Sequence, residues 1–399
     1  MSIQPSSPRW RLYAVAALWL AIGWANLARG TAHPGVPYRP WAFDHHSYSD
    51  LIAMAGDRYF GGGRPVPYLE DRIEYPPLLG LALWLPSFVP GGPLAYFTAG
   101  YLLLAACAMV AIALLARIRG ASAWWLAGTP ALVYYAGLNW DLLPIALLMG
   151  SMLALQRDAP AASGCLAALG GCAKLWPLAI VPTALARLAR RGAWSAAVRI
   201  AGAATLTAAA VNAPLAWLAP ATWAWFWRFN AARGAENSIW EVLRQSHRLA
   251  GLATDAPFLN AATAIPIAGA ALLAMWAAYR RGGDDELAAV RLGTSLVIAV
   301  WIAVNKVWSP QYALWAFAAG ALSSAPAWLF VSHAVIAAVD YHVAFETRAS
   351  RGLIHYFDAV YTTEEIVRTV TYVALAAWIA RALWHEARGG GPRPAGVRG

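Results

Sequence analysis

Residues 93–116, PLAYFTAGYLLLAACAMVAIALLA, form an uninterrupted apolar run that carries no charged side chain. A helix needs about 20 predominantly apolar residues to cross the hydrocarbon core of a bilayer. The run is followed by Arg117 and Arg119, and basic residues gather at the cytoplasmic ends of membrane helices. The stretch therefore predicts a transmembrane helix whose carboxyl end faces the cytoplasm.

Similar runs recur on both sides of this stretch, in a chain that is 60% hydrophobic and 13% charged. The other runs that we interpret as spans are 12–28, 121–137, 141–155, 161–173, 175–189, 194–217, 258–279, 287–304, 310–322, 325–340 and 363–383. Residues 76–90 are apolar but short and rich in proline, so we interpret them as a re-entrant or juxtamembrane segment. The sequence predicts an all-α, polytopic transmembrane helical bundle of about 12 spans, forming one domain over residues 1–385.

Clusters of arginine set the expected orientation of this bundle. Arg9 and Arg11 precede the run 12–28, which is typical of a signal anchor, and further clusters follow alternate runs. We expect the protein in the plasma membrane. Under the positive-inside rule, both of its termini then lie in the cytoplasm. The segments expected outside are the loops 29–77, 218–257 and 341–362. The glycine- and arginine-rich tail, residues 386–399, is expected to be disordered and cytoplasmic.

Two other functional classes receive no support from the composition. The net charge of +10 comes from arginines between apolar runs, and no basic and aromatic surface stripe of the nucleic-acid type is present. Cys107, Cys165 and Cys172 all lie inside apolar segments without a neighbouring histidine or carboxylate. We interpret them as small core residues, so neither a disulfide nor a metal site is expected from them.

The first external loop concentrates acidic residues. Residues 41–77, WAFDHHSYSDLIAMAGDRYFGGGRPVPYLEDRIEYPP, carry six of the twenty carboxylates of the chain. Other polar residues are predicted at the same face, although they come from distant parts of the sequence. They are Asn139, Asp141, Lys174, Asn237, Lys306, Gln311, His342 and His355. Because charges near membrane helix ends are usually retained for function, we expect the active site on this extracytoplasmic face.

An ordered set of motifs links this loop to a known family. The set comprises Asp44, Tyr48, Gly63, Pro67, Tyr68, Tyr75, Pro76 and Pro77; Asn139 and Asp141; Lys174, Trp176 and Pro177; Asn237 and Ser238; and Ser309, Pro310, Gln311, Tyr312 and Trp315. It resembles the membrane glycosyltransferases of the GT-C superfamily, and most closely glycosyltransferase family 87, the polyprenyl-phosphate-mannose-dependent α-mannosyltransferases. The resemblance extends over about 270 residues.

The resemblance implies transfer of a sugar, with inversion, from a polyprenyl-phosphate donor to a hydroxyl of a lipid- or glycan-linked acceptor. Such a reaction needs a base for the acceptor proton and cations for the departing phosphate. We assign the base to Asp44 and name Asp57 as the second choice. Asp50, Glu70, Asp71 and Glu74 are interpreted as solvated or helix-capping residues.

Lys174 is the first choice for the donor phosphate. Further candidates for binding the donor or the acceptor are His45, His46, Tyr48, Tyr75, Asn139, Asp141, Trp176, Arg228, Arg233, Asn237, Lys306, Gln311, Tyr312, His342 and Arg348. Neither a metal nor another cofactor is expected, because adjacent His45 and His46 cannot easily face one ion and no regular ligand spacing follows.

Three alternatives remain open at this point. Arabinofuranose or another pentose could be transferred by the same mechanism. A lipid-linked-sugar flippase would also carry charges inside the membrane, although such transporters often show internal repeats, which this sequence lacks. A non-catalytic scaffold of an envelope complex would use the acidic loop to bind a partner protein.

Overall fold

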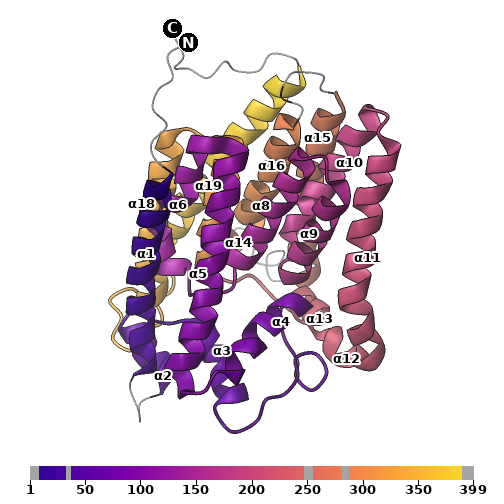
Figure 1. The fold of residues 1–399 in the computed structure, drawn as a ribbon. Helices are drawn as coiled ribbons and strands as arrows, with labels where there is room; N and C mark the ends of the chain where they lie inside the picture. Colours follow the sequence, from indigo (N-terminus) through magenta and orange to yellow (C-terminus); the bar gives the residue numbers. More distant parts are fainter. Residues whose placement is uncertain (1–8, 33–36, 247–254, 281–284, 286, 389–399) are drawn as a thin grey trace.

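The computed structural model describes residues 9–32, 37–246, 255–280, 285 and 287–388, with the side chain of Asp57 excepted. The described chain is a helical bundle without β-strands (Figure 1). Its first part contains α1 Trp10–Ala28, η1 Arg29–Thr31, α2 Tyr38–Asp44, α3 Asp50–Tyr59, α4 Pro77–Trp84, η2 Leu85–Phe88, α5 Gly92–Arg119, η3 Gly120–Ala123, α6 Trp124–Ala127 and α7 Ala131–Tyr135.

The middle of the chain contains α8 Leu142–Gln156, α9 Pro160–Ala173, η4 Trp176–Ala179, α10 Ile180–Arg190, α11 Trp194–Leu218, α12 Pro220–Trp223, α13 Trp225–Ala232 and α14 Ile239–Gln245. The last part contains α15 Ala256–Arg280, α16 Ala288–Val304, η5 Pro310–Tyr312, α17 Ala313–Ser323, α18 Ala327–Glu346 and α19 Ala359–Ala387.

Within the described ranges, six helical segments are long and apolar enough to cross a membrane by length and composition. They are Trp10–Thr31, Gly92–Ala127, Trp194–Leu218, Ala256–Arg280, Ala327–Glu346 and Ala359–Ala387. Several of them expose large apolar side chains, such as Trp217 (86% exposed), Leu206 (72%) and Ile265 (69%). Side chains of this kind are stable at such exposure in contact with lipid. The prediction of an all-α polytopic membrane protein is therefore confirmed.

Shorter apolar helices complete the bundle and differ from continuous spans. The segments Pro77–Phe88, Leu142–Gln156, Pro160–Ala173 and Ala288–Val304 each have 10–17 residues. The predicted span 121–137 is wrong, because the structure divides it into η3, α6 and α7. Pro130, which has no backbone N–H, lies at this break, and Thr129 accepts a hydrogen bond from the N–H of Ala131 at the start of α7.

The two ends of the bundle differ in chemistry. Figure 1 shows the start of α1 and the end of α19 at one end, with α2, α3, α4 and α12 at the other. The first end carries arginine: Arg119 donates to Ser324, and Arg291 pairs with Asp285. A cavity of about 320 Å³ lies there, lined among others by Arg291 and Asp285. Thus the basic and the acidic-loop segments lie at opposite ends, as the sequence predicts.

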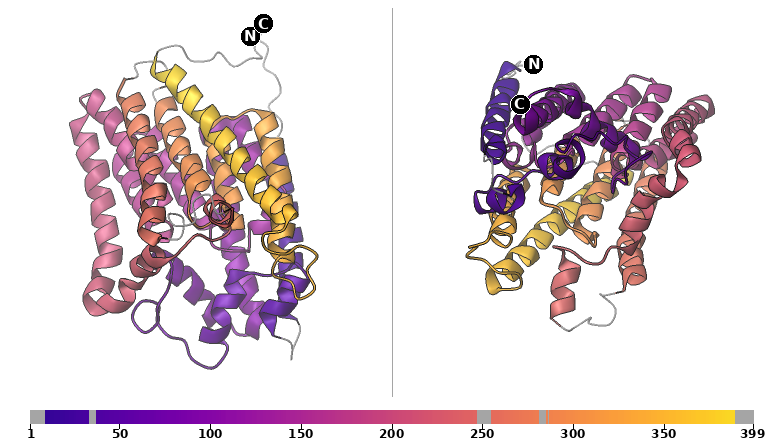
Figure 2. Two further views of the ribbon diagram at one scale, coloured as in Figure 1. Left: turned by 180° about the vertical axis from the view of Figure 1, so that it is seen from behind. Right: turned by 90° about the horizontal axis from the view of Figure 1, so that it is seen from below.

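The acidic-loop end is built around breaks in the helices. Seen from below in Figure 2, α2, α3 and α4 pack across the ends of the longer helices. The chain between α7 and α8 is non-helical and buried, and so is Lys174 in the short non-helical link between α9 and η4. Irregular backbone is tolerated at such depth only where protein or a polar cavity surrounds it. These breaks place Asn139, Asp141 and Lys174 inside the bundle rather than at its surface.

Candidate functional site

Asp50, the first residue of α3, lies at the centre of a polar network. Its Oδ1 accepts a hydrogen bond from the Tyr48 hydroxyl (2.9 Å), and its Oδ2 accepts one from Asn139 Nδ2 (2.7 Å). Asn139 Nδ2 also lies 2.8 Å from the Tyr75 hydroxyl. The interpretation of Asp50 as a solvated or capping residue is therefore wrong, because protein side chains bond both of its oxygens.

Backbone contacts fix the position of Asp50. Ser49 caps α3 by accepting from the N–H of Leu51, and its hydroxyl donates to the carbonyl of Gly137 (2.5 Å). The N–H of Asp50 donates to the carbonyl of Leu138 (2.8 Å). Since the capping residue and its neighbour are both bonded to residues 137–138, α3 begins at a fixed place beside Asn139.

A buried ion pair adjoins this network. Lys174 Nζ donates to Asp141 Oδ1 over 2.7 Å, and Trp315 Nε1 donates to the same oxygen over 2.6 Å. The ammonium lies 5.5 Å from the centroid of Tyr75, 5.9 Å from that of Tyr312 and 5.6 Å from that of Trp315. These distances permit favourable cation–π contacts.

Aromatic rings extend the network to one side. Trp176 packs against Trp315 with ring centroids 5.1 Å apart, and Tyr312 stacks on Trp315 at 4.0 Å. We call the group of Tyr48, Asp50, Tyr75, Asn139, Asp141, Lys174, Trp176, Tyr312 and Trp315 the Asp50 cluster. It unites residues from the first loop, two helix breaks and the start of α17.

Part of the Asp50 cluster is accessible. Asp50, Tyr75 and Tyr312 keep part of their surface accessible, whereas Asp141 and Asn139 are fully buried. Burial raises the pKa of Asp50, while the hydrogen bonds from Asn139 and Tyr48 and the charge of Lys174 lower it. The net effect is a raised pKa, so Asp50 holds a proton more strongly than an exposed aspartate does.

Comparison with protein families identifies the chain. The sequence model of glycosyltransferase family 87 matches residues 74–305, which is more than half of the chain. The chain belongs to glycosyltransferase family 87. Among curated proteins, no sequence is significantly similar to it.

Membership of family 87 makes the protein a glycosyltransferase, and its apolar helices embed it in a membrane. The matched range includes Tyr75, Asn139, Asp141, Lys174 and Trp176, five members of the Asp50 cluster. The cluster thus unites the matched range with Asp50 and Tyr312 from outside it.

Asp44, the predicted base of this family 87 enzyme, lies outside the Asp50 cluster. Its side chain is exposed, and its oxygens accept from the N–H (2.6 Å) and the hydroxyl (2.5 Å) of Ser350. These hydrogen bonds lower the pKa of Asp44. None of these contacts tests whether Asp44 is the catalytic base, so this assignment stays a prediction. The side chain of Asp57, the second choice, lies outside the described residues.

The predicted histidines form a separate group beside α18. His46 Nδ1 lies 2.9 Å from His342 Nδ1, and His46 Nε2 lies 3.0 Å from Glu346 Oε1. His45 stacks on Trp41 with centroids 4.0 Å apart. The structure therefore places His46 beside His342, but it places neither histidine beside Lys174.

The remaining predicted cations have varied surroundings. Lys306 Nζ donates to the carbonyls of Asn230 (2.8 Å) and Arg233 (2.5 Å), so it binds the carboxyl end of α13. Arg348 donates to the carbonyl of Ala344, and Arg228 is exposed on α13.

Arg233 follows α13. It is held by Glu236 through Nε (2.9 Å) and Nη2 (2.6 Å), and its guanidinium lies 5.5 Å from the ring centroid of Phe229. Gln311, which precedes Tyr312, is buried. The backbone carbonyl of Asn237 accepts from Arg368 Nη2 at 2.7 Å.

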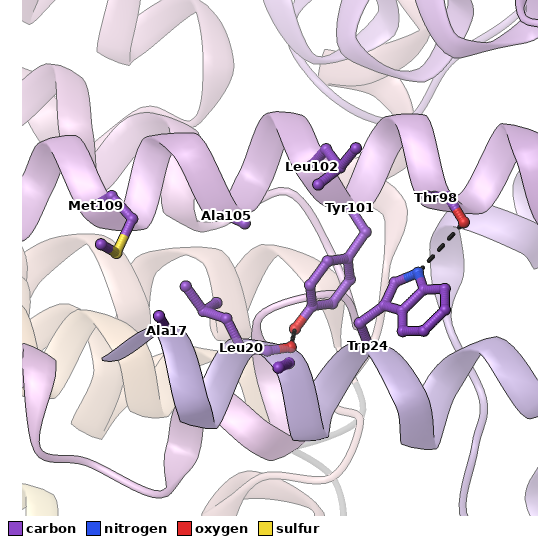
Figure 3. A pocket seen from close by; sticks show the side chains of 9 residues that line it. Ala17, Leu20, Trp24, Thr98, Tyr101, Leu102, Ala105 and Met109 are labelled. Carbon is purple, nitrogen blue, oxygen red and sulfur yellow. Dashed lines mark hydrogen bonds between the residues drawn. The ribbon is translucent and has the colours of Figure 1, made fainter. Parts of the chain in front are cut away.

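A groove between α1 and α5 differs from the Asp50 cluster in that its lining is almost entirely apolar. Figure 3 shows its apolar lining, with a volume of about 350 Å³. Trp24 Nε1 donates to Thr98 across it at 3.2 Å, and the Tyr101 hydroxyl donates to the carbonyl of Leu20. Because no carboxylate or cation lines the groove, it supplies neither a base nor a phosphate-binding group.

Metal binding receives no geometric support in the described part of the chain. There, no group of three or more His, Cys, Asp or Glu side chains is arranged to hold a metal ion. The expectation of a reaction without a metal stays a prediction.

One signal in the sequence pointed to Asp50. The pair Ser49–Asp50 opens an apolar-periodic stretch, which is a helix start with an acidic first residue. This pattern explains why we interpreted Asp50 as a capping residue. Its contact with Asn139, 89 residues away, is visible only in the folded chain.

Proposed function

We propose that this family 87 enzyme transfers a sugar, mannose in the first place, from a polyprenyl-phosphate donor to a hydroxyl of a lipid- or glycan-linked acceptor, with Asp50 as the base. The supporting observation is the contrast between two carboxylates of the Asp50 cluster. Asp141 is neutralised by Lys174, whereas Asp50 forms no ion pair with any described residue and is partly accessible. An accessible carboxylate without an ion pair is the better proton acceptor.

The reaction we envisage is a single displacement at the anomeric carbon. Asp50 takes the proton of the acceptor hydroxyl while the acceptor oxygen forms the new bond to the anomeric carbon. The bond between this carbon and the phosphate oxygen breaks, and the phosphate leaves with the electron pair. Because the bond forms on the face opposite the leaving group, the configuration inverts. A phosphate leaves readily, so no general acid is required.

Arg233 is the cation we assign to the donor phosphate. Its side chain is 31% exposed and bonded only to the more exposed Glu236 among the described ion pairs, which leaves room for an incoming anion. A guanidinium can bind a phosphate through two parallel hydrogen bonds. Lys174 is 9% exposed and held by Asp141, so we assign it a long-range electrostatic role instead of direct phosphate binding.

We further propose that the Asp50 cluster faces the outside of the plasma membrane. The supporting observation is that arginines occupy the last turns of α5, α10 and α15, which end at the opposite end of the bundle, together with the positive-inside rule. Polyprenyl-linked donors suit this location, because their sugar is held at the membrane surface by a lipid anchor.

The test uses the purified full-length protein in lipid nanodiscs. Polyprenyl-phosphate mannose and polyprenyl-phosphate arabinofuranose are supplied in parallel with lipid and glycan acceptors from a bacterial envelope, and transferred sugar is measured. We expect mannose transfer, a loss of about 10²–10⁴-fold in Asp50→Asn, and a change of less than a few-fold in the matched control Asp44→Asn.

Other outcomes decide against parts of the proposal. Loss of activity in Asp44→Asn with retention in Asp50→Asn assigns the base to Asp44. If only the arabinofuranose donor is consumed, the transferred sugar is a pentose and not mannose. The same protein is also reconstituted into liposomes. Movement of the donor across the liposome membrane without any sugar transfer indicates a flippase.

A further inference from the structure

A buried charged group lies apart from the Asp50 cluster, between α18 and the first turns of α19. Arg368 Nη1 lies 2.5 Å from Asp340 Oδ1 and 3.1 Å from Glu364 Oε2. Arg368 Nη2 lies 2.6 Å from Glu365 Oε2. All four side chains are at most 4% exposed. We call these four residues the Arg368 cluster.

The charges of the Arg368 cluster do not balance. One guanidinium faces three carboxylates, so full ionisation would leave two negative charges in the protein interior. No other described lysine or arginine forms an ion pair with these carboxylates, and Trp308 covers the guanidinium with its ring 4.3 Å away. An uncompensated buried charge is so costly that the group usually takes up a proton instead.

The groups around the cluster supply no further positive charge. They are Tyr135 from α7, Glu241 from α14, His333 from α18, and Tyr361 and Tyr372 from α19. Tyr135 donates to Asp340 Oδ2 at 3.3 Å, and Glu241 is paired with Arg244. The ring of His333 contacts that of Tyr372, and its Nδ1 donates to the carbonyl of Leu329. The excess negative charge therefore remains within the cluster.

Two oxygens of the cluster are positioned to carry a proton. Glu364 Oε1 and Glu365 Oε1 are both buried and have no hydrogen-bond partner among the described residues, so the contacts with Arg368 decide between the two glutamates. The other oxygen of Glu364 makes the longest of the three contacts with Arg368, at 3.1 Å compared with 2.5 Å for Asp340 and 2.6 Å for Glu365. Glu364 is thus the carboxylate that Arg368 stabilises least in its ionised form.

We propose that the Arg368 cluster is a proton-binding site and that Glu364 holds the proton at neutral pH. The ligand is a proton, because the side chains of the cluster are not arranged to hold a metal ion. The inference does not depend on which sugar the enzyme transfers.

The proton has a consequence for the neighbouring chain. Arg368 Nη2 also donates to the carbonyl of Asn237 at 2.7 Å, and the backbone of Glu236 is bonded to Lys306 and Trp308. Arg368 is therefore shared between the carboxylates and the segment 233–238, which carries Arg233. Ionisation of Glu364 increases the attraction of the carboxylates for Arg368 and weakens its hold on Asn237.

The direct test is infrared spectroscopy of the full-length protein in nanodiscs. A protonated carboxyl group absorbs at a C=O stretching frequency distinct from that of a carboxylate. We expect this band in the wild type at pH 7, its loss as the pH is raised, and its absence in Glu364→Gln. Absence of the band in the wild type overturns the proposal without requiring any variant to fold. A band that persists in Glu364→Gln and disappears in Glu365→Gln overturns the assignment to Glu364.

Thermal unfolding provides a second measurement. If the folded state holds a proton that the unfolded state has released, stability falls as the pH rises above the usual range of a glutamate. We expect the wild-type Tm to fall between pH 6 and pH 9 and Glu364→Gln, which mimics the protonated form, to lose this slope. Asp340→Asn, the matched control, removes the shortest contact of Arg368 and is expected to lower the Tm at pH 6, where the wild-type cluster holds its proton. Equal loss of Tm in both variants, with an unchanged slope, contradicts the proposal.

Discussion

Lys174 and Asp141 form a buried ion pair, with Nζ and Oδ1 2.7 Å apart, beside a second carboxylate, Asp50, that has no such partner among the described residues. The pair joins the end of α9 to the start of α8. Its cation lies within reach of three aromatic faces and lowers the pKa of Asp50 from a distance. One lysine thereby serves both the packing of the bundle and the electrostatics of the site.

Replacing Lys174 by methionine is expected to destabilise the protein by about 3–5 kcal/mol, because Asp141 is left as a buried charge without a partner. The measurement is the free energy of unfolding in mixed micelles. The double variant Lys174→Met, Asp141→Asn keeps an acceptor for Trp315 and removes the charge, so we expect it to be more stable than the single variant. Equal stability of the two variants would show that the pair is not coupled.

Replacing Tyr48 by phenylalanine is expected to shift the pH dependence of sugar transfer. The Tyr48 hydroxyl stabilises ionised Asp50 and lowers its pKa, so its removal raises that pKa further. A base must be ionised to accept a proton. The acid limb of the kcat/KM profile should therefore move to higher pH in Tyr48→Phe. An unchanged acid limb would separate Asp50 from the proton transfer, provided that the variant still binds donor.

Replacing Gly80 by alanine is expected to disturb the segment that carries Tyr75. A Cβ at Gly80 would lie 2.3 Å from Cε2 of Tyr68, whose hydroxyl donates to the carbonyl of Tyr75 at 2.9 Å. Overpacking of this kind costs about 1–3 kcal/mol. Unfolding and donor binding are measured together. Gly202→Ala, where nothing lies within 4 Å, is the control and should stabilise α11 by about 0.5–1 kcal/mol.

Replacing Lys306 by methionine is expected to cost about 1.5–3 kcal/mol, the usual range for hydrogen bonds to a charged group. The variant loses the donor that binds the carbonyls of Asn230 and Arg233. Thermal unfolding checks the effect, and Arg228→Met is the control because Arg228 is exposed on α13, the helix whose carboxyl end Lys306 binds. A stable Lys306→Met enzyme with impaired donor binding alone would instead support the original expectation of a phosphate contact.

The sequence predicted the outer features of the fold well, for reasons visible in single segments. A run such as 93–116 has one stable state in a bilayer, since a helix satisfies all of its own backbone hydrogen bonds. The prediction failed at 121–137, where apolar composition continued across the break at Pro130. A hydropathy average does not detect such a break, because the residues on both sides are apolar. The backbone hydrogen bonds of the helix are nevertheless interrupted there, since proline has no N–H.

For the site, the sequence selected most of the residues that the structure brings together, but it did not select Asp50. Tyr48, Tyr75, Asn139, Asp141 and Lys174 were expected at one face, and the structure brings them together. Asp44 and Asp50 lie six residues apart, and the resemblance to family 87 favoured Asp44. The surroundings of the two carboxylates depend on Ser350 and Asn139, which are distant in sequence.

By itself, the sequence determined that this chain is a helical membrane protein with arginine at one end and an acidic loop at the other, because hydropathy and charge act locally along each segment. The resemblance to family 87 was likewise readable from ordered motifs. Only the tertiary structure decided which carboxylate is held ready in a partly accessible network, which lysine is committed to a neighbour, and where Arg368 meets three acids. These properties depend on contacts between segments far apart in the chain, and no local pattern specifies the distance between them.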